Sequence, residues 1–224
     1  MEETVINETK NVTKVKVGRV YPIIKRVFDL LFSFLGIIFL LFPISIFVKI
    51  AYLLSGDKES IFYAQYRVGK DGKLFPFYKY RSMVPNAKEM LDKILKEDKK
   101  LAKEYKINKK LENDPRITKV GKFLRKTSLD ELPQLINILD GQMSIIGNRP
   151  YLPKEKEDMG KYYNDIIKTK PGLTGYWQVN GRSNTTFKKR CKLESYYSNH
   201  CGIKMDVKIF FKTFKVVLFG KDAK

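Results

Sequence analysis

One uncharged stretch, residues 30–48, dominates the hydrophobic pattern of this chain. Its 19 residues approach the roughly 20 that an α-helix needs to cross a bilayer. Pro43 predicts a kink inside the stretch, and Ser45 is placed to satisfy a backbone group that the kink frees. Basic residues flank both ends, so neither orientation of a single crossing is favoured. We therefore predict a re-entrant membrane helix hairpin that bends at Pro43; the alternative is a buried core helix.

Two segments with β-like patterns follow, at residues 61–68 and 74–81. Residues 69–72 join them and contain an Asp-Gly pair, which is typical of a tight turn, so we predict a small antiparallel β-hairpin. Side chains alternate along a strand, which places Lys79 and Arg81 on the same side. They are candidates for contacting an anion. The alternative is a solvated edge protected by basic side chains.

The patterns of the middle and later chain are weaker. Residues 86–112 predict a charged surface helix or helical hairpin without chemistry. Residues 140–150 predict a short apolar strand between two turns, with Arg149 on the loop that follows. Residues 168–182 are typical of a glycine-rich, basic loop whose glycines allow close approach to a ligand.

Residues 206–219 predict an amphipathic helix. Lysines lie on one face, and the opposite face is apolar and includes Phe210 and Phe214, which suits the plane of a membrane interface. An ordinary core-packing helix is the alternative. The fold we expect is a helix-rich, mixed α/β fold with three parts: a flexible N-terminus (1–21), a re-entrant membrane helix (22–56), and a domain that ends in the interfacial amphipathic helix (57–224).

The candidate chemistry lies in residues 127–135, which contain the adjacent acids Asp130 and Glu131. Ser128 with Glu131 fits a capping box, and Pro133 fits a first helical turn, so we expect the acids at or just before a helix N-terminus. Such a terminus favours negative charge and can bind phosphate. The alternative is an ordinary capped helix with acids in its first turn. Basic residues surround the pair in sequence: Arg116, Lys119, Lys122, Arg125, Lys126 and Arg149.

Composition narrows the partners of this chain. Lys and Arg number 44 against 24 acids, and the net charge of +20 implies nucleic acid, anionic lipid or a phosphorylated substrate. The uncharged stretch argues against a soluble nucleic-acid-binding protein, so we expect no nucleic acid. Two cysteines and one histidine are too few for a disulfide framework or a four-ligand zinc site. We expect both thiols to be reduced.

Seven motifs follow one another in a fixed order along the chain. They are Lys25-Arg26-x-Phe28-Asp29, Gln65-x-Arg67-Val68-Gly69-x-x-Gly72-Lys73-x-Phe75, Tyr78-Lys79-Tyr80-Arg81-Ser82-Met83, Asp114-Pro115-Arg116-Ile117-Thr118-x-x-Gly121, Ser128-Leu129-Asp130-Glu131-Leu132-Pro133-Gln134-Leu135, Met143-Ser144-x-x-Gly147-x-Arg149-Pro150 and Lys170-Pro171-Gly172-Leu173-Thr174-Gly175. From about residue 22 onward the chain therefore resembles the bacterial sugar transferase family, the monotopic phosphoglycosyl transferases. One departure is Asn148, where the family usually has proline. Residues 86–112 and 151–153 are similar to the branch that transfers galactose or glucose phosphate.

The resemblance implies an activity. The family moves a sugar 1-phosphate from a UDP-sugar to undecaprenyl phosphate and releases UMP, the first membrane step of polysaccharide or glycoconjugate synthesis. The expected route is a covalent phosphosugar on Asp130, with Mg2+ held by Asp130 and Glu131. Glu131 is expected to orient either the metal or the acceptor phosphate. Substrate phosphates are expected to contact four residues: Lys79, Arg81, Arg125 and Arg149.

The resemblance also implies a location. We expect a bacterial inner membrane protein with its catalytic domain on the cytoplasmic face, and the family pattern is compatible with a homodimer. A shallow re-entrant helix and the interfacial C-terminal helix would hold Asp130 at headgroup depth. The alternative function is a non-catalytic basic scaffold on the membrane surface. That alternative leaves the acid pair among so many basic groups without an explanation.

Overall fold

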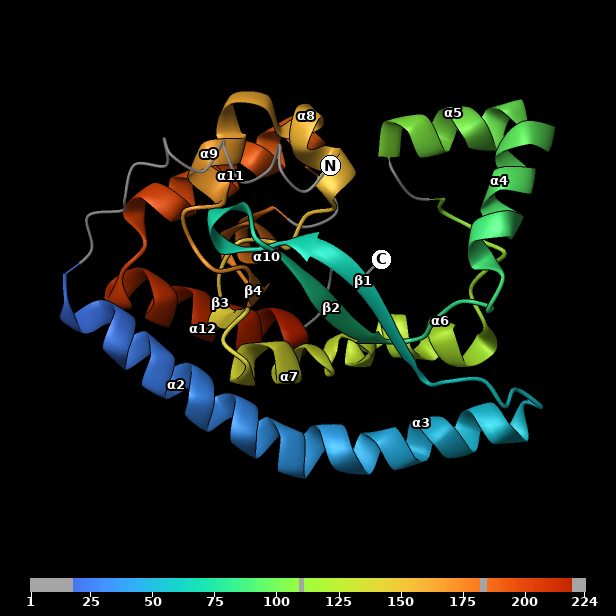
Figure 1. Ribbon diagram of the computed structural model, residues 1–224, viewed down its shortest axis with the longest axis horizontal. Coiled ribbons are helices and arrows are strands. Elements are labelled where there is room, and N and C mark those ends of the chain that lie inside the picture. Colours follow the sequence, from blue (N-terminus) through green and yellow to red (C-terminus); the bar gives the residue numbers. More distant parts are fainter. Residues whose placement is uncertain (1–17, 109–110, 182–184, 219–224) are drawn as a thin grey trace. The chain divides into compact units, whose positions relative to one another are not determined.

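The computed structural model describes residues 18–108, 111–181 and 185–218 (Figure 1). The described residues form two compact units, each built from separate stretches of the chain. The first unit takes its residues from Met1–Phe42, Ala64–Tyr78 and Pro133–Lys224. The second unit takes its residues from Pro43–Tyr63 and Lys79–Leu132.

The apolar stretch is helical throughout. Helix α2 (Val20–Gly36) continues through a π-helical segment, η2 (Ile37–Leu41), into α3 (Phe42–Leu54). The π-helical segment ends two residues before Pro43, where the helix loses one backbone donor and where such irregularities are common. Within Val20–Leu54 the helical segments follow one another directly, without a loop that would divide them into a hairpin. The re-entrant bend therefore stays a prediction.

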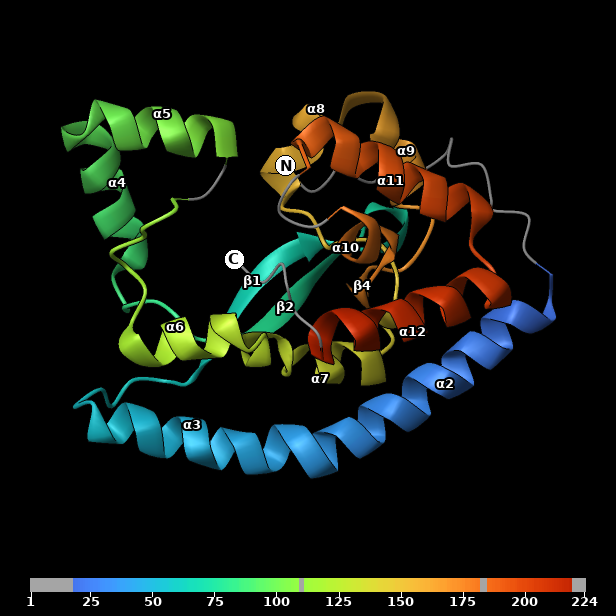
Figure 2. The ribbon, with the colours of Figure 1, turned by 180° about the vertical axis from the view of Figure 1, so that it is seen from behind.

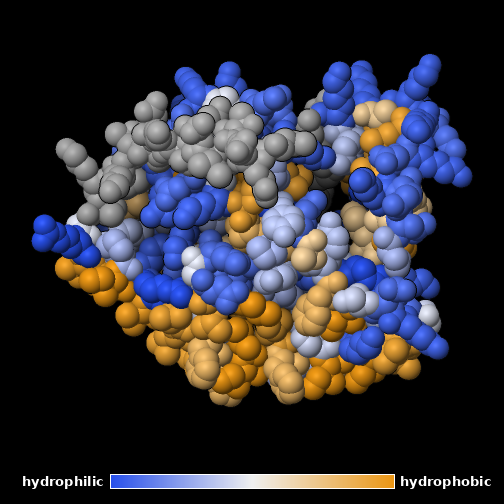
Figure 3. Space-filling model, viewed as in Figure 1, coloured by the Kyte–Doolittle hydropathy of each residue, from blue (hydrophilic) through white to orange (hydrophobic). Residues whose placement is uncertain are grey.

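Most apolar side chains of this helical run face outward, as the orange surface over α2 shows (Figure 3). Within the described residues, the run Val20–Leu54 is the one helix long and apolar enough to cross a membrane. A helix that served as the core of a soluble protein would bury these side chains, so their exposure indicates association with a membrane.

Polar side chains of α2 attach it to the first unit. The buried Asp29 carboxylate accepts hydrogen bonds from the Ser144 hydroxyl at 2.9 Å and the Ile145 N–H at 2.8 Å. Arg26 donates to the carbonyls of Ile138 and Leu139, which end helix α7 (Gln134–Leu139). An acid in an apolar helix needs such partners, so these bonds account for the presence of Asp29. Figure 1 shows α2, α7 and α12 side by side.

The predicted β-hairpin is confirmed. Strands β1 (Phe62–Val68) and β2 (Leu74–Tyr80) form a two-stranded sheet, joined by a short 3-10 turn, η3 (Lys70–Gly72). Pro76 of β2 has no backbone N–H to donate, and Asn137 contacts the strand at this point. Its side chain donates to the Pro76 carbonyl at 2.7 Å and accepts the Tyr78 N–H at 3.1 Å.

A second small sheet in the first unit corrects the predicted loop at residues 168–182. Strand β3 (Ser144–Ile146), expected from the sequence, pairs in parallel with β4 (Gly172–Thr174), and α10 (Tyr176–Asn180) follows. A Cβ atom on Gly172 would lie 2.1 Å from the Gly147 nitrogen, so the glycine serves close backbone packing. The pairing joins segments far apart in sequence, which no local pattern indicates.

The rest of the first unit is helical. Short helices α8 (Lys156–Met159) and α9 (Tyr163–Ile166) precede α11 (Phe187–His200) and α12 (Ile203–Leu218). The 3-10 turns η5 (Pro153–Glu155) and η6 (Gly160–Tyr162) lie among them. Helix α12 confirms the predicted C-terminal helix as far as Leu218; the predicted end lies outside the described residues. The Phe210 ring packs edge-on against Phe28 and Phe32 of α2, while Phe214 stays half exposed.

The second unit contains α3 and three further helices. Helices α4 (Ala87–Glu97) and α5 (Lys99–Asn108) confirm that residues 86–112, predicted as a surface helix or a helical hairpin, are mainly helical where described. Helix α6 (Lys119–Lys126) is capped by the Thr118 hydroxyl, which accepts the Gly121 N–H at 2.9 Å. A Cβ on Gly121 would lie 1.9 Å from the Ser82 carbonyl oxygen, so α6 runs close to the chain that leaves β2.

Candidate active site

The acid pair lies on a single 3-10 turn of the second unit, η4 (Leu129–Glu131). The predicted position just before a helix is confirmed, because Pro133 is the N-cap residue of α7. The predicted capping box is wrong. Ser128 takes a left-handed conformation with φ of 58° and makes no side-chain capping bond. The chain therefore turns sharply at Ser128, which leaves Asp130 buried at 8% exposure.

Lys79 of β2 joins the two acids. Its ammonium nitrogen lies 2.9 Å from Oε1 of Glu131 and 3.4 Å from Oδ2 of Asp130. Burial raises the pKa of Asp130, and the charge of Glu131 adds to that effect, while the charges of Lys79 and Arg125 oppose it. The structure thus brings together three predicted site residues. The Asp130 carboxylate is buried, the Glu131 carboxylate is half-exposed, and both contact the Lys79 ammonium group.

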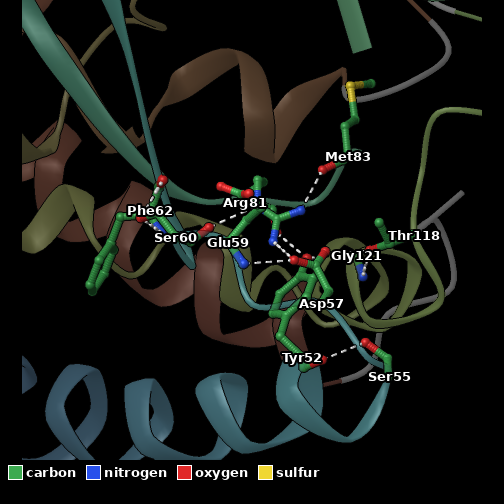
Figure 4. Close-up of polar contacts among 10 residues, drawn as sticks. All are labelled: Tyr52, Ser55, Asp57, Glu59, Ser60, Phe62, Arg81, Met83, Thr118 and Gly121. Carbon is green, nitrogen blue, oxygen red and sulfur yellow. Dashed lines mark hydrogen bonds and ion pairs between the residues drawn. The ribbon is translucent and has the colours of Figure 1, made fainter. Parts of the chain in front are cut away.

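Arg125 and Arg81 differ in their surroundings. Arg125 is exposed on α6, donates from Nε to the Ser82 hydroxyl at 2.9 Å, and acts electrostatically on Asp130. Arg81 is buried, and its guanidinium donates hydrogen bonds to Asp57 at 2.9 Å and to the carbonyls of Ser60 and Met83 (Figure 4). These contacts favour a structural role for Arg81 over the predicted contact with phosphate. Arg125 stays a predicted phosphate ligand.

The donor set at this turn suits a hard divalent cation. Mg2+ is commonly bound through one or two carboxylates together with substrate phosphates and water. Asp130 and Glu131 are adjacent, and both reach the same cation, the Lys79 ammonium. Among the described residues no group of three acid, histidine or cysteine side chains converges. The two acids therefore fit Mg2+ only where substrate oxygens complete its coordination.

Arg149 belongs to the first unit and stays a predicted phosphate ligand. Asn148 before it is buried and donates to the Ser198 hydroxyl at 2.6 Å and the Ile166 carbonyl at 3.1 Å. The side-chain amide thus anchors the loop where the family usually has a rigid proline.

Sequence reasoning missed Glu194 of α11. Its side chain is 1% exposed, and Oε2 accepts the backbone N–H of Arg149 at 2.8 Å. Its Oε1 atom has no hydrogen-bond partner within the described residues. Burial lowers the pKa of Arg190, and the nearby charge of Arg149 lowers it further. The Arg190 guanidinium is therefore a second positive charge close to Arg149. Glu194 therefore anchors the backbone of the Arg149 loop through this hydrogen bond. The sequence does not indicate this role, because it depends on the packing of α11 against the loop.

Glu194→Gln is expected to change how stability depends on pH. Burial raises the pKa of the Glu194 carboxyl to about 8, whereas its unfolded value is about 4.3. Between these values the folded chain keeps a proton that the unfolded chain has lost, so wild-type stability falls as pH rises, by at most about 1.4 kcal/mol per pH unit. Gln keeps the acceptor for Arg149 and does not ionise. The variant should lose less thermal stability between pH 5 and about 8 than wild type does.

The control for this measurement is Glu157→Gln, which changes an exposed glutamate of α8. Thermal unfolding of all three proteins in the same detergent gives the comparison. Parallel pH profiles for wild type and Glu194→Gln would contradict a raised pKa at Glu194.

Comparison with known proteins decides the family. Residues 20–220 match the family model described as "Bacterial sugar transferase". The chain belongs to the bacterial sugar transferase family. The match runs from the start of α2 past the last described residue of α12, so it covers residues from both units of this sugar transferase.

Curated relatives carry related names. The "Undecaprenyl-phosphate galactose phosphotransferase" of Salmonella typhimurium is 44% identical over 198 residues, which cover 87% of this chain and 40% of that protein. The "UDP-glucose:undecaprenyl-phosphate glucose-1-phosphate transferase" of Escherichia coli K12 is 37% identical over 199 residues, which cover 85% and 39%. The "Exopolysaccharide production protein ExoY" of Rhizobium meliloti is 35% identical over 209 residues, which cover 92% of each chain. This sugar transferase thus spans about 40% of the length of the Salmonella protein.

Proposed function

We propose that this sugar transferase moves a sugar 1-phosphate from a UDP-sugar to undecaprenyl phosphate. The observation that carries the proposal is the contact of Lys79 with both Asp130 and Glu131. In this arrangement Asp130, the buried carboxylate that would act as the nucleophile, lies beside Lys79, whose ammonium group can bind phosphate oxygens. The relatives' names, with their undecaprenyl-phosphate and UDP-sugar terms, support the choice of substrates.

The proposed reaction consists of two displacements at one phosphorus atom. An Asp130 oxygen attacks the β-phosphorus of the donor, the bond from that phosphorus to the bridging oxygen breaks, and UMP leaves with the bonding electrons. An oxygen of undecaprenyl phosphate then attacks the same phosphorus and releases the Asp130 carboxylate. The lipid product is undecaprenyl diphosphate sugar, and the enzyme returns to its starting state.

The second unit's own groups deal with the accumulated negative charge. Lys79 pairs with both acids and can exchange one of them for a phosphate oxygen. Arg125, exposed and electrostatically coupled to Asp130, can contact the departing UMP or the acceptor phosphate. Glu131 would keep its ion pair with Lys79 while Asp130 reacts. Mg2+ bound by the acids and substrate oxygens would supply further neutralisation of phosphate charge.

We place the enzyme in the bacterial inner membrane with its catalytic residues on the cytoplasmic face. The exposed apolar run Val20–Leu54 supports membrane insertion, and basic residues at both of its ends support a re-entrant path. A single cysteine at residue 5, in a variant lacking Cys191 and Cys201, tests this topology. A membrane-impermeant thiol reagent should label it only after the cells are opened. Labelling of intact cells would show a spanning helix.

The released nucleotide distinguishes this reaction from ordinary glycosyl transfer. Full-length protein with undecaprenyl phosphate, Mg2+ and a set of UDP-sugars should release UMP, because the diphosphate bond is cut. Release of UDP alone would mean that the sugar moved without its phosphate. A non-catalytic scaffold would release neither nucleotide above the level of a protein-free control.

A further inference from the structure

A groove of about 760 Å³ lies on the first unit, and none of the residues that line it belongs to the acid pair. Its walls come from the start of α2, from α10, from the end of α11 and from α12. Figure 2 shows α10 beside both α11 and α12. Residues from all three helices line the groove. Its volume falls in the range of about 300–1,000 Å³ that is typical of small-ligand sites.

The groove is strongly basic. Lys204, Lys208 and Lys212 follow one another at intervals of four residues along α12, so they form one stripe on the wall of the groove. Lys212 is oriented by Asn180 of α10, whose side-chain oxygen lies 2.8 Å from its ammonium nitrogen. Among the described residues that line the groove there is no aspartate or glutamate. Three ammonium groups without a lining acid favour an anionic occupant.

A second part of the groove wall is aromatic. The rings of Tyr176 and Tyr196 lie 5.3 Å apart, and the Tyr196 ring stacks on His200 at 4.2 Å. All three residues line the groove. Aromatic residues with polar tips are preferred at the headgroup level of membranes. This wall therefore suits a ligand that carries both a phosphate and an organic body.

The position of the groove indicates the source of the anion. Its lining includes Val20, the first residue of α2, whose side chain is 62% exposed. On α12, the exposed apolar residues Val207, Phe211 and Phe214 lie next to the lysine stripe. A helix with an apolar face beside a row of lysines rests in the interface with its lysines at the lipid phosphates. The groove is thus at the depth where phospholipid headgroups are found.

We propose that this groove binds the headgroup phosphate of an anionic phospholipid. The lysine stripe contacts the phosphate, the aromatic wall contacts the glycerol and headgroup, and the acyl chains follow the exposed apolar side chains of α2 and α12. The proposal rests on membrane association and not on the transfer reaction, because the acid pair and Lys79 belong to the other unit.

The test compares ligands on full-length protein in neutral detergent by native mass spectrometry. The probes are dihexanoyl phosphatidylglycerol, dihexanoyl phosphatidylcholine and UDP. Wild type should bind one phosphatidylglycerol in preference to phosphatidylcholine. The triple variant Lys204→Gln, Lys208→Gln, Lys212→Gln should bind it at least about tenfold more weakly, since each lysine near a lipid phosphate contributes about a factor of five.

A matched control removes the same charge elsewhere. Lys188→Gln, Lys189→Gln, Lys192→Gln changes three exposed lysines of α11 that do not line the groove, and this variant should bind phosphatidylglycerol as wild type does. Replacing the groove lysines by arginine should retain binding. Undiminished phosphatidylglycerol binding by the groove variant, or equal binding of phosphatidylcholine by wild type, would overturn the proposal. Competition by UDP that the groove variant abolishes would make the groove a nucleotide site instead.

Discussion

Asp130→Asn is expected to abolish sugar-phosphate transfer, with a fall in kcat of roughly a thousandfold or more. The substitution keeps the shape of the side chain and removes the oxygen nucleophile. Because the carboxyl is buried and its pKa is raised, wild-type activity should also fall on acidification at a higher pH than an ordinary aspartate would give. Initial rates of UMP release across pH measure both effects.

The same variant should not be destabilised. The folded-state pKa of Asp130 is raised, so its ionised form costs stability at neutral pH, and asparagine removes that cost. Lys79 keeps its 2.9 Å contact with Glu131. The thermal midpoint should therefore equal or exceed that of wild type. Asp92→Asn, at an exposed position of α4, is the matched control and should retain full activity. Transfer at the wild-type rate by Asp130→Asn would remove Asp130 from the mechanism.

Lys79→Met is expected to lower kcat by roughly a hundredfold or more, in the range found when one preorganised charge is removed from an active site. The variant leaves two adjacent carboxylates without the cation that both contact, so the pKa of Asp130 should rise further. A pH profile should accordingly show the acid limb of activity displaced to higher pH. A shift of that kind would not follow from a general loss of folding.

Two comparisons sharpen the Lys79 experiment. Lys79→Arg keeps a cation and should recover part of the activity. Lys122→Met removes an exposed lysine of α6 in the same unit and should leave both rate and pH profile unchanged. A Lys79→Met enzyme with the wild-type rate and profile would mean that its contact with the acids in this structure has no catalytic role.

Local sequence patterns predicted the elements that depend on local chemistry. The Asp-Gly turn indicated the β-hairpin, and period and charge indicated α4, α5 and α12. The strand β4 was missed because it is only three residues long and its partner β3 lies far back in sequence. The two units interleave separate stretches of the chain, which no local pattern indicates, and the predicted division into residues 1–21, 22–56 and 57–224 stays a prediction.

In the site, too, local sequence indicated some features and the packing of distant segments determined others. Asp130, Glu131 and Lys79 could be named from the sequence because motif and alternation both indicate them. The capping box failed because Ser128 adopts a positive φ that no residue pattern required. Arg81 was predicted to contact phosphate because charge alone does not show that Asp57 and two carbonyls engage its guanidinium. Burial of Glu194 depends on the packing of α11 and left no signal in the sequence.

The covalent intermediate gives the most direct test of the account. Full-length enzyme with Mg2+ is mixed with a UDP-sugar that carries radioactive phosphorus only in the β-phosphate, and acceptor lipid is withheld. The label should appear on the protein, map to the peptide that contains Asp130, and pass to the lipid when undecaprenyl phosphate is added. The Asp130→Asn enzyme should carry no label. Label that reaches the lipid without ever residing on Asp130 would contradict the account.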